Sequence, residues 1–248
     1  MPYFLHDGLL ELKAPDTLTG EEAHHALHVR RVRPGERVEV QDSSGKRFLV
    51  QINELLRKEV SFTPVEALEP PVPSPLKLHL LLAHPREKAL DWSLQKATEL
   101  GVHEVHLFGG TRSPKSSGEG ADRLNRWERI CWEACKQCGR QTPPRLRWSE
   151  DLESALEATE STLTWVLEGT SPGGPTHEAL RAATDVQLVI GPEGGFSPEE
   201  RELLATHAIP GWSLGERILR TETAVVAATS ILQFMAGDLG ARLDFDCL

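Results

Sequence analysis

Long apolar runs are missing from this sequence of 248 residues. The longest weakly polar stretch, residues 224–237 (AVVAATSILQFMAG), is well short of the ~20 residues that a helix needs to cross a bilayer. Also missing is an amino-terminal stretch that combines a basic region, an apolar core and a small-residue cleavage site. We therefore expect a cytoplasmic protein without a membrane-spanning segment.

Cysteine is scarce, and its four positions do not form the evenly distributed framework of a disulfide-stapled secreted domain. Three of them, Cys131, Cys135 and Cys138, have a spacing that could hold an iron–sulfur cluster if a loop let the thiolates converge. They lie instead in residues 127–138 (WERICWEACKQC), a strongly helical stretch, and share one helix face. We expect reduced thiols that fill a core seam.

Basic residues are fewer than acidic ones, which gives a net charge of −10. The distribution is uneven: residues 112–147 carry a net charge of +5, whereas residues 148–248 carry −12. Basic clusters of this kind either contact phosphates or form ordinary solvated faces paired with glutamates. The residues concerned are Arg30, Arg31, Arg33 and Arg37, and then Arg112, Lys115, Arg123, Arg126, Arg129, Lys136, Arg140, Arg145 and Arg147.

A proline-rich segment at residues 69–75 (EPPVPSP) divides the chain. Its four prolines disfavour both helix and ladder pairing and favour an extended tether. We therefore predict two domains, residues 1–70 and residues 76–248. In the first, alternating apolar positions in residues 37–41 and 47–52 predict a β-hairpin, so we expect a small β-rich module.

After the linker, strands alternate with helices, which is typical of an α/β domain with a mainly parallel sheet. Apolar runs predict the strands, and apolar residues at helical spacing predict the helices. The expected strands are residues 77–83, 104–108, 163–167 and 186–190, and the expected helices are residues 87–100, 123–138, 152–158 and 176–183.

A glycine-rich loop follows the last of these strands, in residues 186–200 (VQLVIGPEGGFSPEE). Three glycines in five residues let a ligand approach the backbone closely, and Ser197 and Pro198 suit the start of a helix. The acidic side chains, Glu193 among them, disfavour a phosphate ligand, and the spacing matches no nucleotide-binding motif. A plain strand–turn–helix corner is the structural alternative.

A second irregular segment, residues 213–224 (SLGERILRTETA), concentrates glycine, charge and hydroxyl groups in a loop, where functional groups tend to lie. The structural alternative is a helix cap built by Thr221 or Thr223.

These two segments, together with residues 91–102 (DWSLQKATELGV), resemble the RsmE family of small-subunit ribosomal RNA uridine N3-methyltransferases, which belongs to the SPOUT superfamily. Residues 24–40 (HHALHVRRVRPGERVEV) are similar to the family's RNA-binding module, so the resemblance covers nearly the whole chain. It implies an α/β trefoil-knot methyltransferase domain, a PUA-like β-barrel before it, S-adenosylmethionine as cofactor, and a homodimer with residues 224–235 in its interface. The implied partner is ribosomal RNA of the small ribosomal subunit.

The resemblance also implies the site. The cofactor pocket would comprise residues of three segments, the first two of which follow predicted strands: Leu167, Glu168 and Gly169, then Ile190, Gly191, Pro192, Glu193 and Gly195, and then Ser213, Leu214, Gly215, Ile218, Leu219 and Arg220. The expected RNA contacts are Arg30, Arg31, Arg33, Arg37, Arg86, Lys88, Arg112 and Lys115. Residues 84–88 (HPREK) depart from the family's usual lysine–glycine turn but keep its basic character.

Histidines at helical spacing give a weaker signal. His24, His25 and His28 could bind a metal, but no acidic or cysteine partner lies in register. We expect these side chains to face solvent or RNA, and we expect no metal.

Methylation of uracil N3 requires loss of the imide proton while the methyl donor is held in line. Because N3 lies on the pairing edge, the base must be unpaired or flipped out. Our hypothesis is that Arg220 stabilises developing negative charge, and that Glu193 or Glu222 orients the base or relays its proton. The alternatives are a SPOUT-type 2′-O-ribose methyltransferase and a non-catalytic, RNA-binding ribosome assembly factor.

Overall fold

The computed structural model describes residues 3–70, 74–114, 120–159, 163–169, 173–181, 183–236 and residue 239, so the expected RNA contact Lys115 lies outside the described residues. The chain divides into two compact units. The first comprises Met1–Val72 with Cys135–Thr142, and the second comprises Pro73–Ala134 with Pro143–Leu248. No helix in the described ranges is long and apolar enough to span a membrane.

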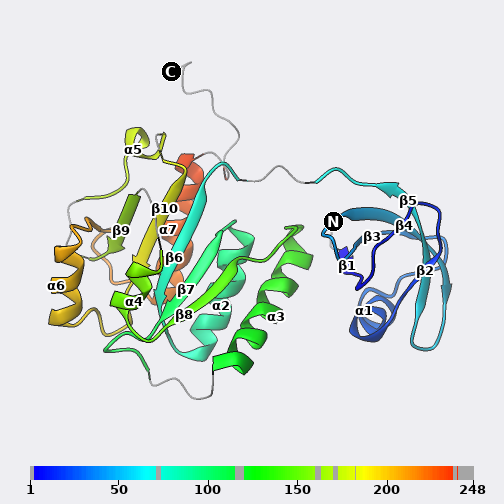
Figure 1. Cartoon of the computed structure of the whole chain (residues 1–248), viewed down its shortest axis with the longest axis horizontal. Coiled ribbons are helices and arrows are strands. Elements are labelled where there is room, and N and C mark those ends of the chain that lie inside the picture. The colour runs from blue at the N-terminus through cyan, green and yellow to red at the C-terminus, as the bar shows by residue number, and fades with distance from the viewer. Residues whose placement is uncertain are drawn as a thin grey trace. The chain divides into compact units, whose positions relative to one another are not determined.

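The first unit is a curled five-stranded sheet with two short helical segments (Figure 1). Its strand order is β1-β3-β4-β5-β2, and β1 pairs parallel with β3 whereas the other pairs are antiparallel. The elements are β1 (Tyr3–Leu5), β2 (Asp16–Leu18), α1 (Gly20–His24), the π-helix η1 (His25–Arg30), β3 (Arg37–Gln41), β4 (Arg47–Leu55) and β5 (Val60–Ala67).

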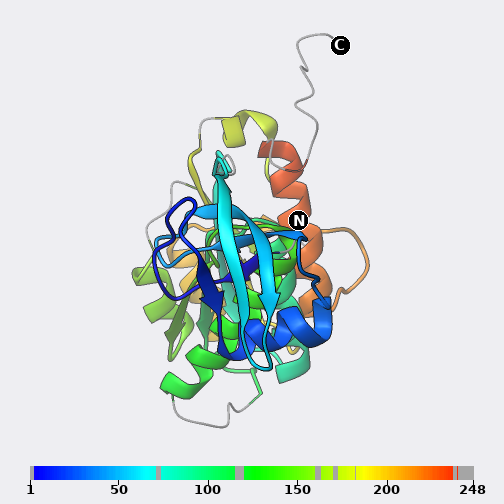
Figure 2. The ribbon, with the colours of Figure 1, turned by 90° about the vertical axis from the view of Figure 1, so that its right-hand side faces the viewer.

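The predicted hairpin of this unit is confirmed as the pair β3 and β4. Alternate residues of β4, Phe48, Val50 and Ile52, are buried in the core of the unit, so their side chains explain why the sequence alternates there. Figure 2 shows the long, twisted strands β4 and β5 (blue to cyan). The β-rich module expected from the sequence is thus confirmed.

The segment Cys135–Thr142 is fastened to this sheet by polar contacts. The hydroxyl of Tyr3 donates to the carbonyl oxygen of Arg140 at 2.7 Å, and Arg47 donates to that of Gly139 at 2.7 Å. Lys136, which is buried, pairs with Glu22 at 2.8 Å. These contacts satisfy buried polar groups, which explains why the segment groups with the first unit.

The second unit contains a six-stranded sheet in which every pair is parallel, as predicted. Its strand order is β11-β9-β10-β6-β7-β8. Sequence reasoning located four of these strands and missed β8 and β11. The bounds are β6 (Lys77–Ala83), β7 (Glu104–Phe108), β8 (Arg145–Ser149), β9 (Leu163–Leu167), β10 (Asp185–Ile190) and β11 (Gly211–Trp212).

Helices cover both faces of this sheet (Figure 1). In β6, Leu78, Leu80 and Leu82 pack toward α2, α3 and α7, whereas Leu81 and Ala83 pack toward α4 and α6. Burial on both faces accounts for the continuous apolar run of this strand. The helices are α2 (Glu87–Glu99), α3 (Gly120–Cys138), α4 (Leu152–Glu157), α5 (His177–Arg181), α6 (Pro198–Thr206) and α7 (Thr221–Ala236).

The clustered cysteines lie within α3, so their helical placement is confirmed. Cys131 and Cys135 are fully buried, as the predicted core seam requires, but the prediction is wrong for Cys138, which is exposed near the end of the helix. Among the described residues, no group of three or more His, Cys, Asp or Glu side chains is arranged to hold a metal ion.

Candidate functional site

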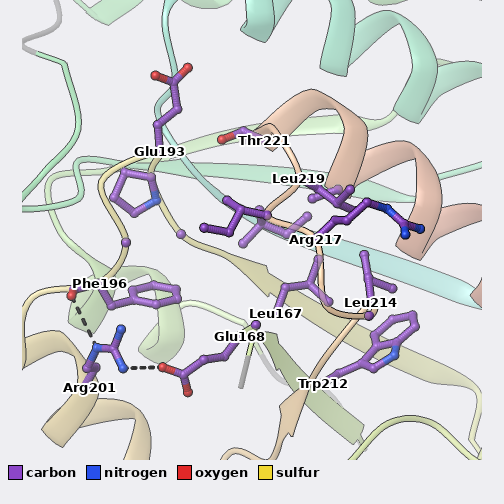
Figure 3. A pocket seen from close by; sticks show the side chains of 18 residues that line it. Leu167, Glu168, Glu193, Phe196, Arg201, Trp212, Leu214, Arg217, Leu219 and Thr221 are labelled. Carbon is purple, nitrogen blue, oxygen red and sulfur yellow. Dashed lines mark hydrogen bonds and ion pairs between the residues drawn. The ribbon is translucent and has the colours of Figure 1, made fainter. Parts of the chain in front are cut away.

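The loops that follow β9, β10 and β11 surround a pocket at the carboxyl ends of these three strands (Figure 3). In open parallel α/β sheets, ligands bind beyond the carboxyl ends of the strands. The pocket encloses about 230 Å³. Its position therefore makes it the leading candidate for a small-molecule site.

The walls of the pocket are mainly apolar, and charged groups stand at its edge. In the view of Figure 3, the Glu193 side chain lies at the end opposite the pair formed by Glu168 and Arg201. Such a lining suits a flat apolar ring together with a polar, charged portion. The apolar side chains are Leu167, Ile190, Phe196, Trp212, Leu214, Ile218 and Leu219, and the charged ones are Glu168, Glu193, Arg201 and Arg217.

The glycine-rich loop requires glycine at two positions for different reasons. A Cβ built on Gly191 would stand 2.8 Å from the Phe196 ring, which is too close for any side chain. Gly195 has a φ of +72°, a backbone conformation that L residues rarely adopt. The loop therefore brings its backbone to the pocket surface without intervening side chains.

A capping box fixes the end of this loop at the start of α6, as the sequence predicted for Ser197. The Ser197 hydroxyl accepts from the backbone N–H of Glu200 at 3.2 Å, and the Glu200 carboxylate accepts from the backbone N–H of Ser197 at 2.7 Å. Glu200 also accepts from the backbone N–H of Thr111 at 2.8 Å. The loop thus ends on a rigid support that reaches the segment after β7.

Two ion pairs flank the pocket. Arg201 pairs with Glu168, and its Nε also donates to the carbonyl oxygen of Phe196 at 3.4 Å (Figure 3). Arg86 lies 3.9 Å from the carboxylate of Glu193, and its side chain is 79% exposed. Solvent weakens such an exposed pair, so Glu193 remains available to a ligand.

The loops after β9 and β11 hold one another. The backbone N–H of Glu168 donates to the carbonyl oxygen of Trp212 at 3.0 Å, and the Ser213 hydroxyl donates to that of Gly169 at 3.3 Å. A Cβ on Gly174 would stand 2.8 Å from the Trp212 ring. These contacts show that the two segments pack closely, which explains why glycine occurs at residue 174.

Nearly all of the residues expected to bind the cofactor line this pocket. Ser213 and Arg220 do not line it. Ser213 hydrogen-bonds to Gly169 in the loop after β9, and the Arg220 side chain is exposed. Sequence reasoning missed Phe196, Arg201, Trp212, Arg217, Thr221 and Ala224, of which all but Arg201 and Trp212 stand inside the motifs that were recognised.

The three residues of the catalytic hypothesis are dispersed. Glu193 lines the pocket, and Arg220 and Glu222 lie next to Thr221, which lines it at the start of α7. One carboxylate oxygen of Glu222 is buried and has no hydrogen-bond partner among the described residues. An orphaned buried acceptor near a pocket is a candidate for contact with a ligand or a proton.

The expected RNA contacts fall in both units. Arg30, Arg31, Arg33 and Arg37 are exposed in the first unit, where Arg31 ends η1 in a left-handed conformation with φ 53°. In the second unit Arg86, Lys88 and Arg112 are exposed.

Other basic residues match the paired alternative instead. Arg126 pairs with Asp91 at 2.6 Å, Arg147 with Glu104 at 3.2 Å, and Lys136 with Glu22 as described above.

His84, where the sequence departs from the family pattern, is buried between the rings of Trp127 and Trp148, with centroids 5.9 and 5.8 Å away. Burial lowers the pKa of His84 below its ordinary value, and the positive charge of Arg123 lowers it further. The neutral form of His84 is therefore favoured, and its ring packs against both tryptophans after β6.

Comparisons with known proteins agree with this geometry. Residues 72–233 match a family described as "RNA methyltransferase domain", and residues 18–65 match one described as "RNA methyltransferase PUA domain". The chain is 28% identical to the ribosomal RNA small subunit methyltransferase E of Bacillus subtilis, over 88% of this chain and 89% of that protein.

Two solved structures with bound S-adenosylmethionine are similar over nearly the whole chain. A methyltransferase from Legionella pneumophila is 32% identical with a TM-score of 0.81, and the match covers 94% of this chain and 96% of that one. The ribosomal RNA small subunit methyltransferase E of Neisseria gonorrhoeae is 29% identical with a TM-score of 0.83, covering 97% of this chain and 100% of that one.

Proposed function

The chain belongs to the ribosomal RNA small subunit methyltransferase E family, and we propose that it methylates N3 of a specific uridine in 16S ribosomal RNA. Family membership makes the chain an S-adenosylmethionine-dependent ribosomal RNA methyltransferase. The observation that supports the site most directly is the glycine-lined pocket at the ends of β9, β10 and β11. In this assignment, residues 76–248 form the catalytic domain, and residues 1–70 form the RNA-binding domain.

The lining of the pocket fits S-adenosylmethionine. Leu167, Ile190 and Leu219 offer an apolar surface for a planar base, and the glycine-rich loops offer backbone groups for hydrogen bonds. The carboxylates of Glu168 and Glu193 favour a positively charged ligand. When bound, S-adenosylmethionine supplies an electrophilic methyl group on a sulfonium centre.

Removal of the N3 proton leaves negative charge on the uracil, which a nearby cation stabilises. Arg220 is exposed and directly precedes the pocket residue Thr221, so its guanidinium can reach a base that approaches from solvent. Glu193, or Glu222 with its unpartnered oxygen, orients the base or accepts its proton. Glu193 lines the pocket itself, whereas Glu222 is one residue beyond the pocket residue Thr221, and either would act on a base that has been flipped out of its pairing.

Support for a trefoil knot comes from the close passage of the chain after β11 against the loop after β9. Ser213 donates to the carbonyl oxygen of Gly169, and a Cβ on Gly174 would stand 2.8 Å from the Trp212 ring, so residues 212–213 lie beside Gly169 and Gly174. We infer that the carboxyl-terminal part of the chain threads through this loop before α7 begins.

Exposed apolar side chains on α7 support a homodimer. Ile231 is 39% exposed and Phe234 is 50% exposed, and a groove beside them is lined by Leu214, Ala227 and Met235. Apolar patches of this kind mark interaction surfaces. A dimer would let the arginines of one subunit's β-rich module hold RNA that the other subunit methylates in the cytoplasm.

The test is incubation of the purified protein with labelled S-adenosylmethionine and small ribosomal subunits that lack the modification, followed by nucleoside analysis. We expect 3-methyluridine in the small-subunit RNA. Label on ribose would indicate a 2′-O-methyltransferase, and cofactor binding without any label would indicate a binding role in assembly. A parallel reaction with free RNA identifies which form of the RNA is the substrate.

A further inference from the structure

Three consecutive residues after β7 contact the glycine-rich loop. A Cβ on Gly110 would stand 3.4 Å from Cγ of Pro192, and the backbone N–H of Thr111 donates to Glu200. Arg112 then donates from Nη1 to the carbonyl oxygen of Gly194 at 2.9 Å. The segment after β7 therefore braces the loop from the cofactor pocket to the start of α6.

The side chain of Arg112 lies against Gly194 along much of its length. A Cβ built on Gly194 would stand 3.2 Å from Cβ of Arg112 and 3.5 Å from its Cδ. The aliphatic part of Arg112 thus lies against the loop backbone, while its guanidinium reaches the loop carbonyl. A guanidinium has a fixed donor geometry and can hold a carbonyl in one position better than a flexible ammonium can.

The loop and the start of α6 also carry several acidic side chains. Glu193, Glu199 and Glu200 carry three carboxylates within a short stretch, and only Glu200 is buried in a capping box. Hydrogen bonding by the Ser197 hydroxyl and by backbone lowers the pKa of Glu199, and the positive charge of Arg112 adds to this effect. Arg112 therefore acts on the Glu199 carboxylate as well as fixing a carbonyl group.

We propose that Arg112 is a positioning residue for the cofactor: it holds residues 192–195 in the conformation that binds S-adenosylmethionine. The sequence predicted Arg112 as an RNA contact, whereas in this proposal its guanidinium mainly holds the loop in place. It rests on the proposed cofactor site, because Pro192, Glu193 and Gly195 line that pocket. RNA that binds near Arg112 would then influence cofactor affinity through this brace.

The experiment measures S-adenosylmethionine binding by calorimetry with the full-length protein and no RNA. Loss of one hydrogen bond of ordinary strength should raise the Kd of Arg112→Ala roughly five- to tenfold. Arg112→Lys should recover part of this loss, since it keeps the charge and one donor. The matched control is Arg57→Ala, an exposed arginine in the turn between β4 and β5 of the other unit, and its Kd should equal that of the wild type.

Hydrogen–deuterium exchange of residues 191–197 in the free protein gives a second readout that needs no ligand. The amides of this loop should exchange faster in Arg112→Ala, while the strands of the sheet keep wild-type protection. Wild-type Kd and wild-type exchange in Arg112→Ala, with a raised KM for RNA, would overturn the inference and leave Arg112 as an RNA contact. Failure of the wild type to bind S-adenosylmethionine would overturn the proposed function and this inference together.

Discussion

The ring of Phe196 occupies the space that a side chain on Gly191 would need. We predict that Gly191→Ala displaces either the ring or the loop and raises the Kd for S-adenosylmethionine by about tenfold or more, while the protein stays folded. Isothermal calorimetry and a thermal melt measure the two effects. The double variant with Phe196→Leu should recover part of the affinity, because the smaller side chain makes room. Equal affinity of the single variant and the wild type would contradict this account of the loop.

Arg217 and Arg220 lie three residues apart but differ in their relation to the pocket, because only Arg217 lines it. We predict that Arg217→Ala weakens cofactor binding several-fold. Arg220→Ala should leave cofactor affinity unchanged and lower kcat by roughly a hundredfold, the size typical for loss of one group that stabilises developing charge. Calorimetry and single-turnover kinetics at saturating cofactor separate the two. Full turnover by Arg220→Ala would remove Arg220 from the catalytic hypothesis.

The exposed arginines of the first unit should contribute to RNA affinity by neutralising phosphates. We predict that Arg30→Ala and Arg33→Ala each weaken RNA binding several-fold, and that each reduces the slope of log K against log salt by about 0.7 to 1, the value for one phosphate charge. Filter binding at several salt concentrations measures both quantities. Arg57→Ala controls for the removal of positive charge alone, and an unchanged slope in all three variants would argue that RNA binds elsewhere.

Phe234 on α7 should lie in the dimer interface. We predict that Phe234→Glu converts a dimer into a monomer, because a carboxylate cannot be buried unpaired without a large cost. Sedimentation velocity measures the oligomeric state. A wild-type protein that is monomeric at micromolar concentration would contradict the proposed homodimer. A Phe234→Glu variant that stays dimeric would place the interface on another surface.

The stability of the protein should depend on pH because three histidines have lowered pKa values. Burial is the largest cause that lowers the pKa of His84, His103 and His106 below the ordinary value of 6.5. The unfolded chain therefore binds more protons than the folded one just below pH 6.5, so the free energy of unfolding should fall as the pH drops from 7 to 5. Urea denaturation across this range measures the slope. His84→Phe keeps an aromatic ring but cannot be protonated, so it should flatten the slope.

The sequence predicted the central strands well because they are buried on both faces. β6 and β7 are mostly apolar and largely buried, which leaves little ambiguity about their bounds. In contrast, β8 (RLRWS) alternates arginine with apolar residues at the edge of the sheet, and β11 is only two residues long. Neither produces a periodic signal strong enough to separate a strand from a loop.

The pocket residues also divide into those that a local motif predicts and those that only the folded structure brings together. Motifs that are contiguous in sequence predicted the loop residues, whereas Arg201 and Trp212 reach the pocket only because their elements converge there. The basic clusters were ambiguous for a similar reason. The partner of the buried Lys136 is Glu22, which lies more than a hundred residues earlier, so nothing near Lys136 in the sequence predicts the pair.

The hydrogen bonds between the β-rich unit and Cys135–Thr142 constrain the order in which contacts form during synthesis. Residues 3–70 leave the ribosome first. In the finished fold, however, Tyr3, Arg47 and Gln41 donate to the carbonyl groups of Arg140, Gly139 and Gln141, respectively. Those acceptors emerge only after the strands β6 and β7 have been translated. The core of this unit comes from residues 4–67 alone, so only its contacts to residues 135–142 must wait until α3 has been made.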